Sequence, residues 1–339
     1  MKLATYLLPI RRSVFSKFEA CQFADYFKRL DAAGCEVFVI DGSPSEVFAE
    51  HAKIWSDVCR HEVVDSRFTF LNDKVNGVHS GVALATTDKI ILADDDIRYD
   101  KIDIQRMCVL LDKFEVVRPQ NYLRDDVRPW VLMEAARMLI NRAILRTADY
   151  PGTCGFRRQT FLNASEYDGD VLFDNEELIR HFARRGARIA YENDFFILKR
   201  SPTFRKWLEQ RPRQAYEDFG LRGKTVLFAS ILPLAVVITA IGGIFALAWF
   251  WLVIHIISGA LAVIGRKRGT AAQYFDWFHA PFYASSWIFE RAISTWVAFY
   301  WRIRFGGYPF GRRLLCKGIG RDWFEGGRIA AKMATPPDD

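Results

Sequence analysis

Short apolar runs alternate with amphipathic segments from residue 1 to residue 222 of the chain. The apolar runs predict strands at residues 4–9, 36–40, 61–64, 89–93, 115–117 and 188–191. Between them, helical spacing of apolar positions predicts helices at residues 15–33, 72–85, 102–114, 128–148 and 175–185. This alternation is typical of an α/β fold, in which helices cover both faces of a sheet.

The pattern changes after Lys224, because residues 225–265 contain no Asp, Glu, Lys or Arg. One helical crossing of a bilayer takes roughly 20 apolar residues, so this run of 41 is long enough for two. Gly242 and Gly243 lie near its midpoint and could form a turn. Basic residues flank the run on each side, which favours a cytoplasmic location for both of its ends. We therefore expect a transmembrane hairpin of two helices over residues 223–266. A buried helix pair is the alternative, although long soluble helices usually carry charge on one face.

A third apolar segment, residues 281–301, includes one polar stripe at helical spacing. The stripe consists of Glu290, Arg291, Ser294, Thr295, Ala298 and Arg302. Such a helix is typical of the membrane interface. A full crossing is the alternative, but it would export the arginines that follow the segment, against the usual distribution of positive charge. We predict an interfacial amphipathic helix and a basic tail over residues 267–339.

Composition and charge change this picture little. Half of the 339 residues are hydrophobic, which allows a large core. The net charge is +7, but the positive residues gather beside the apolar segments, which favours an anionic membrane surface over nucleic acid. The six cysteines are scattered without a C-x-x-C pair, as in reduced cytosolic proteins. Arg11 and Arg12 follow the first apolar run directly, so a strand is expected there rather than a signal peptide.

Three aspartates, Asp94, Asp95 and Asp96, follow the strand predicted at residues 89–93. Carboxylates at a strand end can point toward a hard cation that prefers oxygen ligands, such as Mg²⁺ or Mn²⁺. That cation would neutralise a diphosphate and help a nucleoside diphosphate to leave. A solvated acidic turn or a helix N-cap is the alternative.

Two other residues are candidates for binding a nucleotide. Asp41 ends the second predicted strand, where an acid can bind a base or a ribose hydroxyl. Lys74 opens the helix before the aspartate strand and could reach a phosphate. Taken singly, Lys74 would more often be a surface lysine.

The order of these features resembles the family 2 glycosyltransferases. Asp41, Lys74 with Gly77, and ADDD at 93–96 are followed by VRPQNY at 117–122, PGTCGFRR at 151–158, LFDNEELIRHFARRGARI at 172–189 and QRPRQAY at 210–216. The resemblance extends from the first strand to the start of the hairpin. It implies the GT-A nucleotide-diphospho-sugar fold over residues 1–222, a mostly parallel sheet flanked by helices, and inversion at the anomeric carbon.

The resemblance also implies roles for individual residues. Asp41 would hold the nucleoside, and Asp96 would bind the metal together with Asp94, which would also hold sugar or ribose beside Asp95. Gln210 and Arg213 look like the Gln and Arg of the Q-x-x-R-W motif near the donor and acceptor sugars, with Arg211 between them. The 155–158 stretch resembles the strand that lines the acceptor side.

The chain departs from the family pattern at two positions. The usual base position is Asn175, which cannot accept a proton, so the base would be Asp174, Glu176 or Glu177. Asp174 is the first choice because it lies at a predicted helix N-terminus, although it could simply cap that helix. Gln214 stands where the motif has Trp, which removes a stacking platform for an acceptor sugar.

These features predict a hexosyltransferase at the inner (cytoplasmic) membrane with its catalytic domain facing the cytosol. The donor would be a nucleotide-sugar, with a UDP-sugar favoured, and the acceptor a lipid hydroxyl, since the layout resembles ceramide glucosyltransferases. A polysaccharide synthase with a glycan acceptor is the second prediction, although two crossings are few for a channel. A third is a non-catalytic glycosyltransferase-like scaffold, which Asn175 in the base position would suit.

Overall fold

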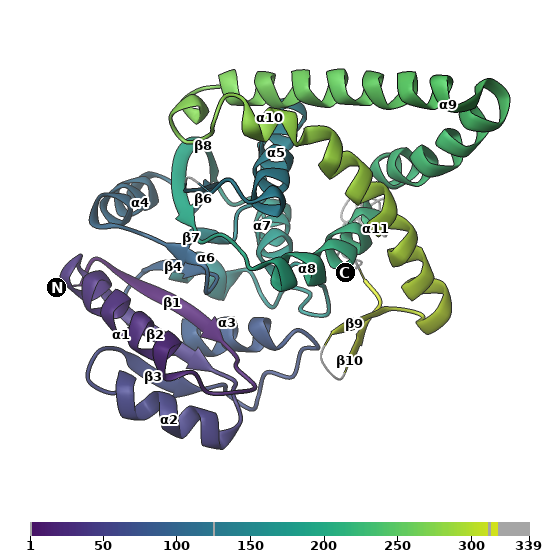
Figure 1. The fold of residues 1–339 in the computed structure, drawn as a ribbon. Helices are drawn as coiled ribbons and strands as arrows, with labels where there is room; N and C mark the ends of the chain where they lie inside the picture. Colours follow the sequence, from purple (N-terminus) through teal and green to yellow (C-terminus); the bar gives the residue numbers. More distant parts are fainter. Residues whose placement is uncertain (1, 125, 311–312, 318–339) are drawn as a thin grey trace, which may run out of the picture.

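The fold is that of a computed structural model, which describes residues 2–124, 126–310 and 313–317. One eight-stranded sheet forms its centre, in the order β3-β2-β1-β4-β7-β6-β8-β5 (Figure 1). The strands are β1 (Ala4–Ile10), β2 (Cys35–Asp41), β3 (Arg60–Val63), β4 (Lys89–Ala93), β5 (Ile97–Arg98), β6 (Val116–Leu123), β7 (Thr153–Arg157) and β8 (Ile189–Lys199). Only β7 and β5 run antiparallel to their neighbours. The predicted α/β fold with a mostly parallel sheet is confirmed.

Helices cover both faces of this sheet. Apolar side chains of α1 and α4 pack on one face, and those of α3, α6 and α7 pack on the other. The first eight α-helices of the chain are α1 (Lys17–Ala32), α2 (Ser45–Trp55), α3 (Asp73–Leu84), α4 (Lys101–Lys113), α5 (Pro129–Ile144), α6 (Arg158–Asn163), α7 (Asp174–Arg184) and α8 (Phe204–Glu217).

The strand order reverses at β1, which lies between β2 and β4. In open α/β sheets, ligands bind outside the carboxyl ends of the strands at such a switch point. Here the carboxyl end of β1 leads into Arg11 and Arg12, and the carboxyl end of β4 leads into Asp94. The topology therefore brings the predicted aspartate cluster to the edge of the sheet where a ligand is expected.

The uncharged segment forms one long helix, α9 (Arg222–Lys267), that bends at Gly243, where φ is 68° and ψ is −166°. Figure 1 shows its two halves meeting at an acute angle, with the second half crossing above α5. Among the described residues it is the one helix long and apolar enough to cross a membrane, and only 11% of its most apolar stretch is buried. The bend falls where the glycine pair predicted a turn. A transmembrane hairpin over residues 223–266 stays a prediction.

The third apolar segment forms α11 (Ala284–Phe305), which follows the short α10 (His279–Phe282) and precedes a hairpin of β9 (Tyr308–Phe310) and β10 (Arg313–Leu315). Most of its polar stripe is turned inward, because Arg291, Ser294 and Thr295 are buried, whereas Arg302 is exposed. Apolar side chains such as Phe289 and Trp296 are exposed instead. A membrane-interface position for α11 stays a prediction, and most of the predicted basic tail lies outside the described residues.

Candidate functional site

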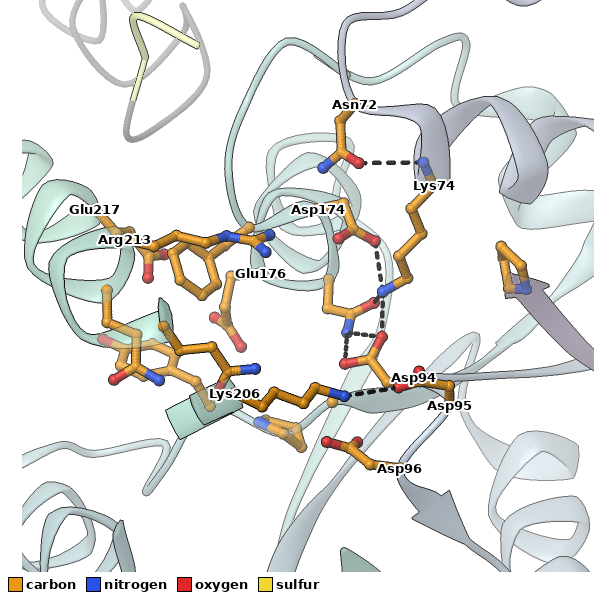
Figure 2. Close-up of a pocket in the computed structure, with 18 of the residues that line it drawn as sticks. Asn72, Lys74, Asp94, Asp95, Asp96, Asp174, Glu176, Lys206, Arg213 and Glu217 are labelled. Atoms are coloured by element: carbon orange, nitrogen blue, oxygen red, sulfur yellow. Dashed lines mark hydrogen bonds and ion pairs between the residues drawn. The ribbon is translucent and has the colours of Figure 1, made fainter. Parts of the chain in front are cut away.

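A cavity of about 380 Å³ opens at the carboxyl ends of β1 and β4. Residues from the sheet domain and from the C-terminal helices line it together (Figure 2). The sheet side contributes Arg11, Arg12, Lys74, Asp94, Asp95, Asp96, Asp174, Asn175, Glu176 and Lys199, and the helical side contributes Lys206, Gln210, Arg213, Gln214, Glu217, Lys224 and Arg291. The structure thus brings most of the predicted site residues into one cavity.

Lys74 lies at the centre of the sheet side. Its Nζ contacts Asp94 and lies 2.8 Å from Asp174 Oδ2 and 2.9 Å from Asn175 Oδ1, and Figure 2 shows it reaching from α3 between the two carboxylates. Burial alone would lower the pKa of Lys74, but the charges of Asp174 and Asp94 outweigh burial and raise it. Lys74 therefore stays charged and ties α3 to α7 and to the end of β4.

Asp95 is neutralised by protein cations. Its carboxylate lies 2.6 Å from Arg12 Nη2 and 3.4 Å from Lys206 Nζ. Burial alone would raise the pKa of Asp95, but Lys206 and Arg12 lower that pKa to about 2. These two cations lie beside the aspartate cluster, where they could also contact a diphosphate.

Asp96 has an incomplete set of partners. Its Oδ1 is buried and has no hydrogen-bond partner among the described residues, and its Oδ2 lies 3.8 Å from Lys199 Nζ. Burial raises the pKa of Asp96, and the charges of Asp94 and Asp95 raise it further. The charge of Lys199 opposes this increase. A carboxylate oxygen of this kind, with Asp94 nearby, fits the oxygen ligands that Mg²⁺ and Mn²⁺ prefer. The residues present therefore fit the predicted metal.

Asp41 lies next to the cavity rather than in its lining. Its Oδ2 lies 2.7 Å from His51 Nδ1 and 3.1 Å from His61 Nε2, and its side chain is fully buried. Burial alone would raise the pKa of Asp41, but the hydrogen bonds of the two histidines hold it well below its usual range. A nucleoside would have to displace an imidazole to bind this carboxylate, while Ile40 and Gly42 beside it do line the cavity.

His51 and His61 were not among the predicted residues. Their ligand atoms and that of Asp41 all lie within 4.8 Å of one another, so this cluster is a second place that could hold a metal ion. Both rings also stack on aromatic side chains, His51 on Trp55 and His61 on Phe48. No motif spacing in the sequence joins the three ligand residues.

The three predicted proton acceptors are placed differently. Asp174 and Glu176 line the cavity, with Asp174 paired to Lys74 and Glu176 lying 2.7 Å from Arg118 Nη2. The carboxylate of Glu177 is fully buried, lies 2.6 Å from Arg184 Nη2, and is not part of the cavity lining.

The residues of the predicted donor and acceptor motif on α8 also differ in whether they line the cavity. Gln210 and Arg213 line the cavity, and Arg213 donates a hydrogen bond to the Leu172 carbonyl. Arg211 is not part of the cavity lining, although its Nη1 lies 3.1 Å from Oε2 of Glu134, which is part of it.

Sequence reasoning missed Glu217, which is also on α8. Its carboxylate lines the cavity 3.4 Å from Arg180 Nη2. Burial raises the pKa of Glu217 to about 7, although Arg180 opposes the shift. Lys199 and Lys206 were missed as well. Only tertiary packing brings these three into the cavity, and no local motif signals them.

No family model matches the chain, and no curated protein matches it in sequence. Among solved structures, it is similar to a mannosyltransferase from Pyrobaculum calidifontis in complex with GDP-Man and Mn²⁺, with a TM-score of 0.46, 14% identity and 86% of each chain covered. It is also similar to glucosyl-3-phosphoglycerate synthase from Mycobacterium tuberculosis in complex with Mn²⁺, UDP and phosphoglyceric acid. That TM-score is 0.41, with 16% identity over 62% of this chain and 75% of the other. Both likenesses are partial.

Proposed function

We propose that the chain is a GT-A glycosyltransferase that moves a hexose from a nucleotide-diphosphate sugar, with a UDP-sugar favoured, to a lipid hydroxyl at the cytosolic face of the inner membrane. One observation carries the proposal. Asp94 and Asp96 follow β4 at the switch point of the sheet and line a cavity that also contains basic side chains. Carboxylates for a divalent cation and cations for phosphate oxygens are what a sugar nucleotide requires.

The diphosphate would bind on the sheet side of the cavity. Arg12 and Lys206 contact Asp95, and Lys199 lies near Asp96, so all three can reach phosphate oxygens beside the carboxylates. Asp96 and Asp94 would hold Mg²⁺ or Mn²⁺, which when bound offsets the negative charge that develops on the leaving diphosphate. Lys74 keeps Asp94 oriented through their contact.

In the transfer step, the acceptor oxygen forms a bond to the anomeric carbon while the bond from that carbon to the diphosphate oxygen breaks. The hydroxyl proton passes to a carboxylate, which gives a glycoside, a nucleoside diphosphate and an inverted anomeric centre. Asp174 is our first choice as base because it lines the cavity and Lys74 holds it in place. General base catalysis of this kind contributes typically about 10²- to 10⁴-fold.

The acceptor would enter from the helical side. Lys224, at the start of α9, and Arg291, on α11, line the same cavity as the aspartates. An acceptor held at a membrane surface by α9 and α11 would therefore present its hydroxyl directly to the site. This placement supports a lipid acceptor.

The test is donor binding and turnover by the full chain in membranes. We expect calorimetry to detect a UDP-sugar, with GDP- and TDP-sugars as comparisons, and expect Mn²⁺ or Mg²⁺ to strengthen binding. Asp96→Asn should remove the metal effect and the release of nucleoside diphosphate, whereas Asp112→Asn, an exposed acid paired with Lys89, should not. If no sugar nucleotide binds with either metal, the proposal fails.

A further inference from the structure

A second, mostly apolar groove of about 740 Å³ lies among α5, α8, α9 and α11. Its apolar lining includes Met133, Leu208, Trp251, Phe289, Ile293 and Val297. One ion pair separates it from the candidate active site, because Arg211 lines the groove while its partner Glu134 lines the cavity with the aspartates. The groove therefore adjoins the side of the cavity where an acceptor would enter.

The groove contains polar groups whose hydrogen bonds are incomplete. Arg211 is 1% exposed, yet its Nη1 and Nη2 make no hydrogen bond to any described residue, although Nη1 lies 3.1 Å from Glu134 Oε2 and 4.0 Å from Glu290 Oε2. Glu290 Oε2 and Trp207 Nε1 are also buried and make no hydrogen bond to any described residue. A buried polar group without a hydrogen bond costs about 1–3 kcal/mol. These groups indicate a ligand that brings polar atoms to an otherwise apolar groove.

The rim of the groove is continuous with the apolar surface of the uncharged helix. Leu208, Phe289 and Ile293 are exposed at the rim, and Trp251 belongs to the second half of α9. Helix α9 has 41 consecutive residues without Asp, Glu, Lys or Arg and is largely exposed over its most apolar stretch. Such a surface is more stable in contact with lipid hydrocarbon than with water. A groove that opens onto such a surface is accessible to the chains of membrane lipids.

We propose that this groove binds the hydrocarbon chain of the lipid acceptor, and that Arg211, Glu290 and Trp207 bind polar atoms where chain and head group join. The acceptor role rests on the proposed function. With its chain in the groove, the lipid would present its hydroxyl beside Glu134, at the edge of the active-site cavity. The groove would thus select an acceptor by its chain, while the cavity selects the donor.

The test uses the full chain in phosphatidylcholine vesicles that carry a photoactivatable diazirine on one acyl chain. After irradiation, mass spectrometry of peptides locates the lipid adducts. We expect adducts on the groove residues of α8 and α11, in addition to adducts on the exposed face of α9 at residues such as Val237 and Ile244.

Groove-filling variants make the test specific. Ser286 lines the groove, and Ser286→Phe should lower the groove adducts at least tenfold while the α9 adducts stay unchanged. Ser230→Phe, on α9 and outside the groove, is the matched control and should change neither set. Ile293→Trp gives a second filling variant in case Ser286→Phe does not fold.

The proposal is overturned if the groove carries no adducts, if the filling variants label as the native chain does, or if the same residues cross-link to a second copy of the chain. Failure of the proposed function would appear separately, as absent release of nucleoside diphosphate from every sugar nucleotide. In that case adducts that Ser286→Phe removes would support a lipid site and overturn only its acceptor role.

Discussion

Lys74 Nζ lies 2.8 Å from Asp174 Oδ2 and also contacts Asp94, so one ammonium group links the residue proposed as base to a residue proposed as metal ligand. The three side chains come from α3, α7 and the end of β4 (Figure 2). Because Lys74 is charged and largely enclosed, it fixes the distance between the two carboxylates. If the two carboxylates have the proposed roles, donor binding and proton transfer would be mechanically connected in this site.

Lys74→Met should weaken donor binding. The variant leaves Asp94 and Asp174 without their shared cation, and a hydrogen bond to a charged group is worth about 1.5–3 kcal/mol, or roughly tenfold to a hundredfold in affinity. Calorimetry with a UDP-sugar and Mn²⁺ measures the change. Lys74→Arg keeps the charge and should recover part of the affinity. Native affinity in Lys74→Met would contradict this role.

Gly152→Ala should damage the metal site without unfolding the chain. A Cβ on Gly152 would lie 2.6 Å from Asp94 Oδ2, too close for the carboxylate to keep its position. We expect Mn²⁺ to bind at least tenfold more weakly, as measured by its effect on nucleotide binding. Gly155→Ala is the control, because the atoms nearest its Cβ would belong to Met107 and Leu111 and not to an aspartate. Equal metal affinities in the two variants would exclude the predicted contact.

The stability of the chain should depend on pH through Glu217, whose pKa burial raises to about 7. An unfolded glutamate has a pKa of about 4.3, so between these values the folded chain holds a proton that the unfolded chain has lost. The stability contributed by Glu217 is therefore complete below about pH 4.3 and is lost as the pH rises through about 7.

Between about pH 5 and about pH 8, the melting temperature of the native chain should accordingly fall more than that of Glu217→Gln. Over this range the native chain should lose about 1–3 kcal/mol more of its unfolding free energy than the variant does. Arg180 and Lys224 oppose the shift, and Asp218 and Glu176 increase it, so all four face the group that titrates. Glu209→Gln, an exposed glutamate on the same helix, should follow the native pH profile. Parallel profiles for all three chains would show that Glu217 does not titrate in this range.

Sequence pattern predicted the apolar strands β1, β2 and β4 well, but it predicted strands that contain polar residues poorly and did not predict β7. The strand at residues 89–93 has the bounds of β4, because an apolar run ends abruptly at Asp94. The strand predicted at residues 115–117 continues in the structure to Leu123, through the buried polar residues Arg118, Gln120 and Asn121. Their hydrogen bonds come from distant segments, such as the Thr147 carbonyl for Arg118, so no local pattern could signal burial.

Within the candidate site, residues that follow a local pattern were likewise predicted, and residues placed by tertiary packing were not. Asp94 and Asp96 were predicted because they follow a buried strand, and their strand order in the sheet brings them to the switch point. His51 and His61 enclose Asp41 only because α2 and β3 pack beside β2, a tertiary arrangement that spacing along the chain does not show. Glu217 depends in the same way on tertiary structure, since its ion-pair partner Arg180 belongs to α7.

Gly243 should be required for the bend in α9. Its φ of 68° and ψ of −166° lie in a region that is essentially restricted to glycine, and another residue there costs about 1–3 kcal/mol. Gly243→Ala should therefore lower the yield of folded chain in membranes or its melting temperature. Gly223→Ala, where a Cβ would meet no neighbour, should leave both unchanged. A native melting temperature for Gly243→Ala would mean that α9 does not need this bend.

If α9 crosses the membrane twice, its bend and its two ends must lie on opposite sides. Ile241 is 84% exposed beside the bend, so Ile241→Cys should react with a membrane-impermeant maleimide added to intact cells. Lys267→Cys, at the end of the helix, should react only after lysis, as should the exposed native cysteines Cys21 and Cys316 if the catalytic domain faces the cytosol. Protection of both introduced cysteines in intact cells would place the whole helix on the cytosolic side. The basic residues that flank α9 would then bind the membrane surface without a crossing, and a lipid acceptor would have to reach the site from that surface alone.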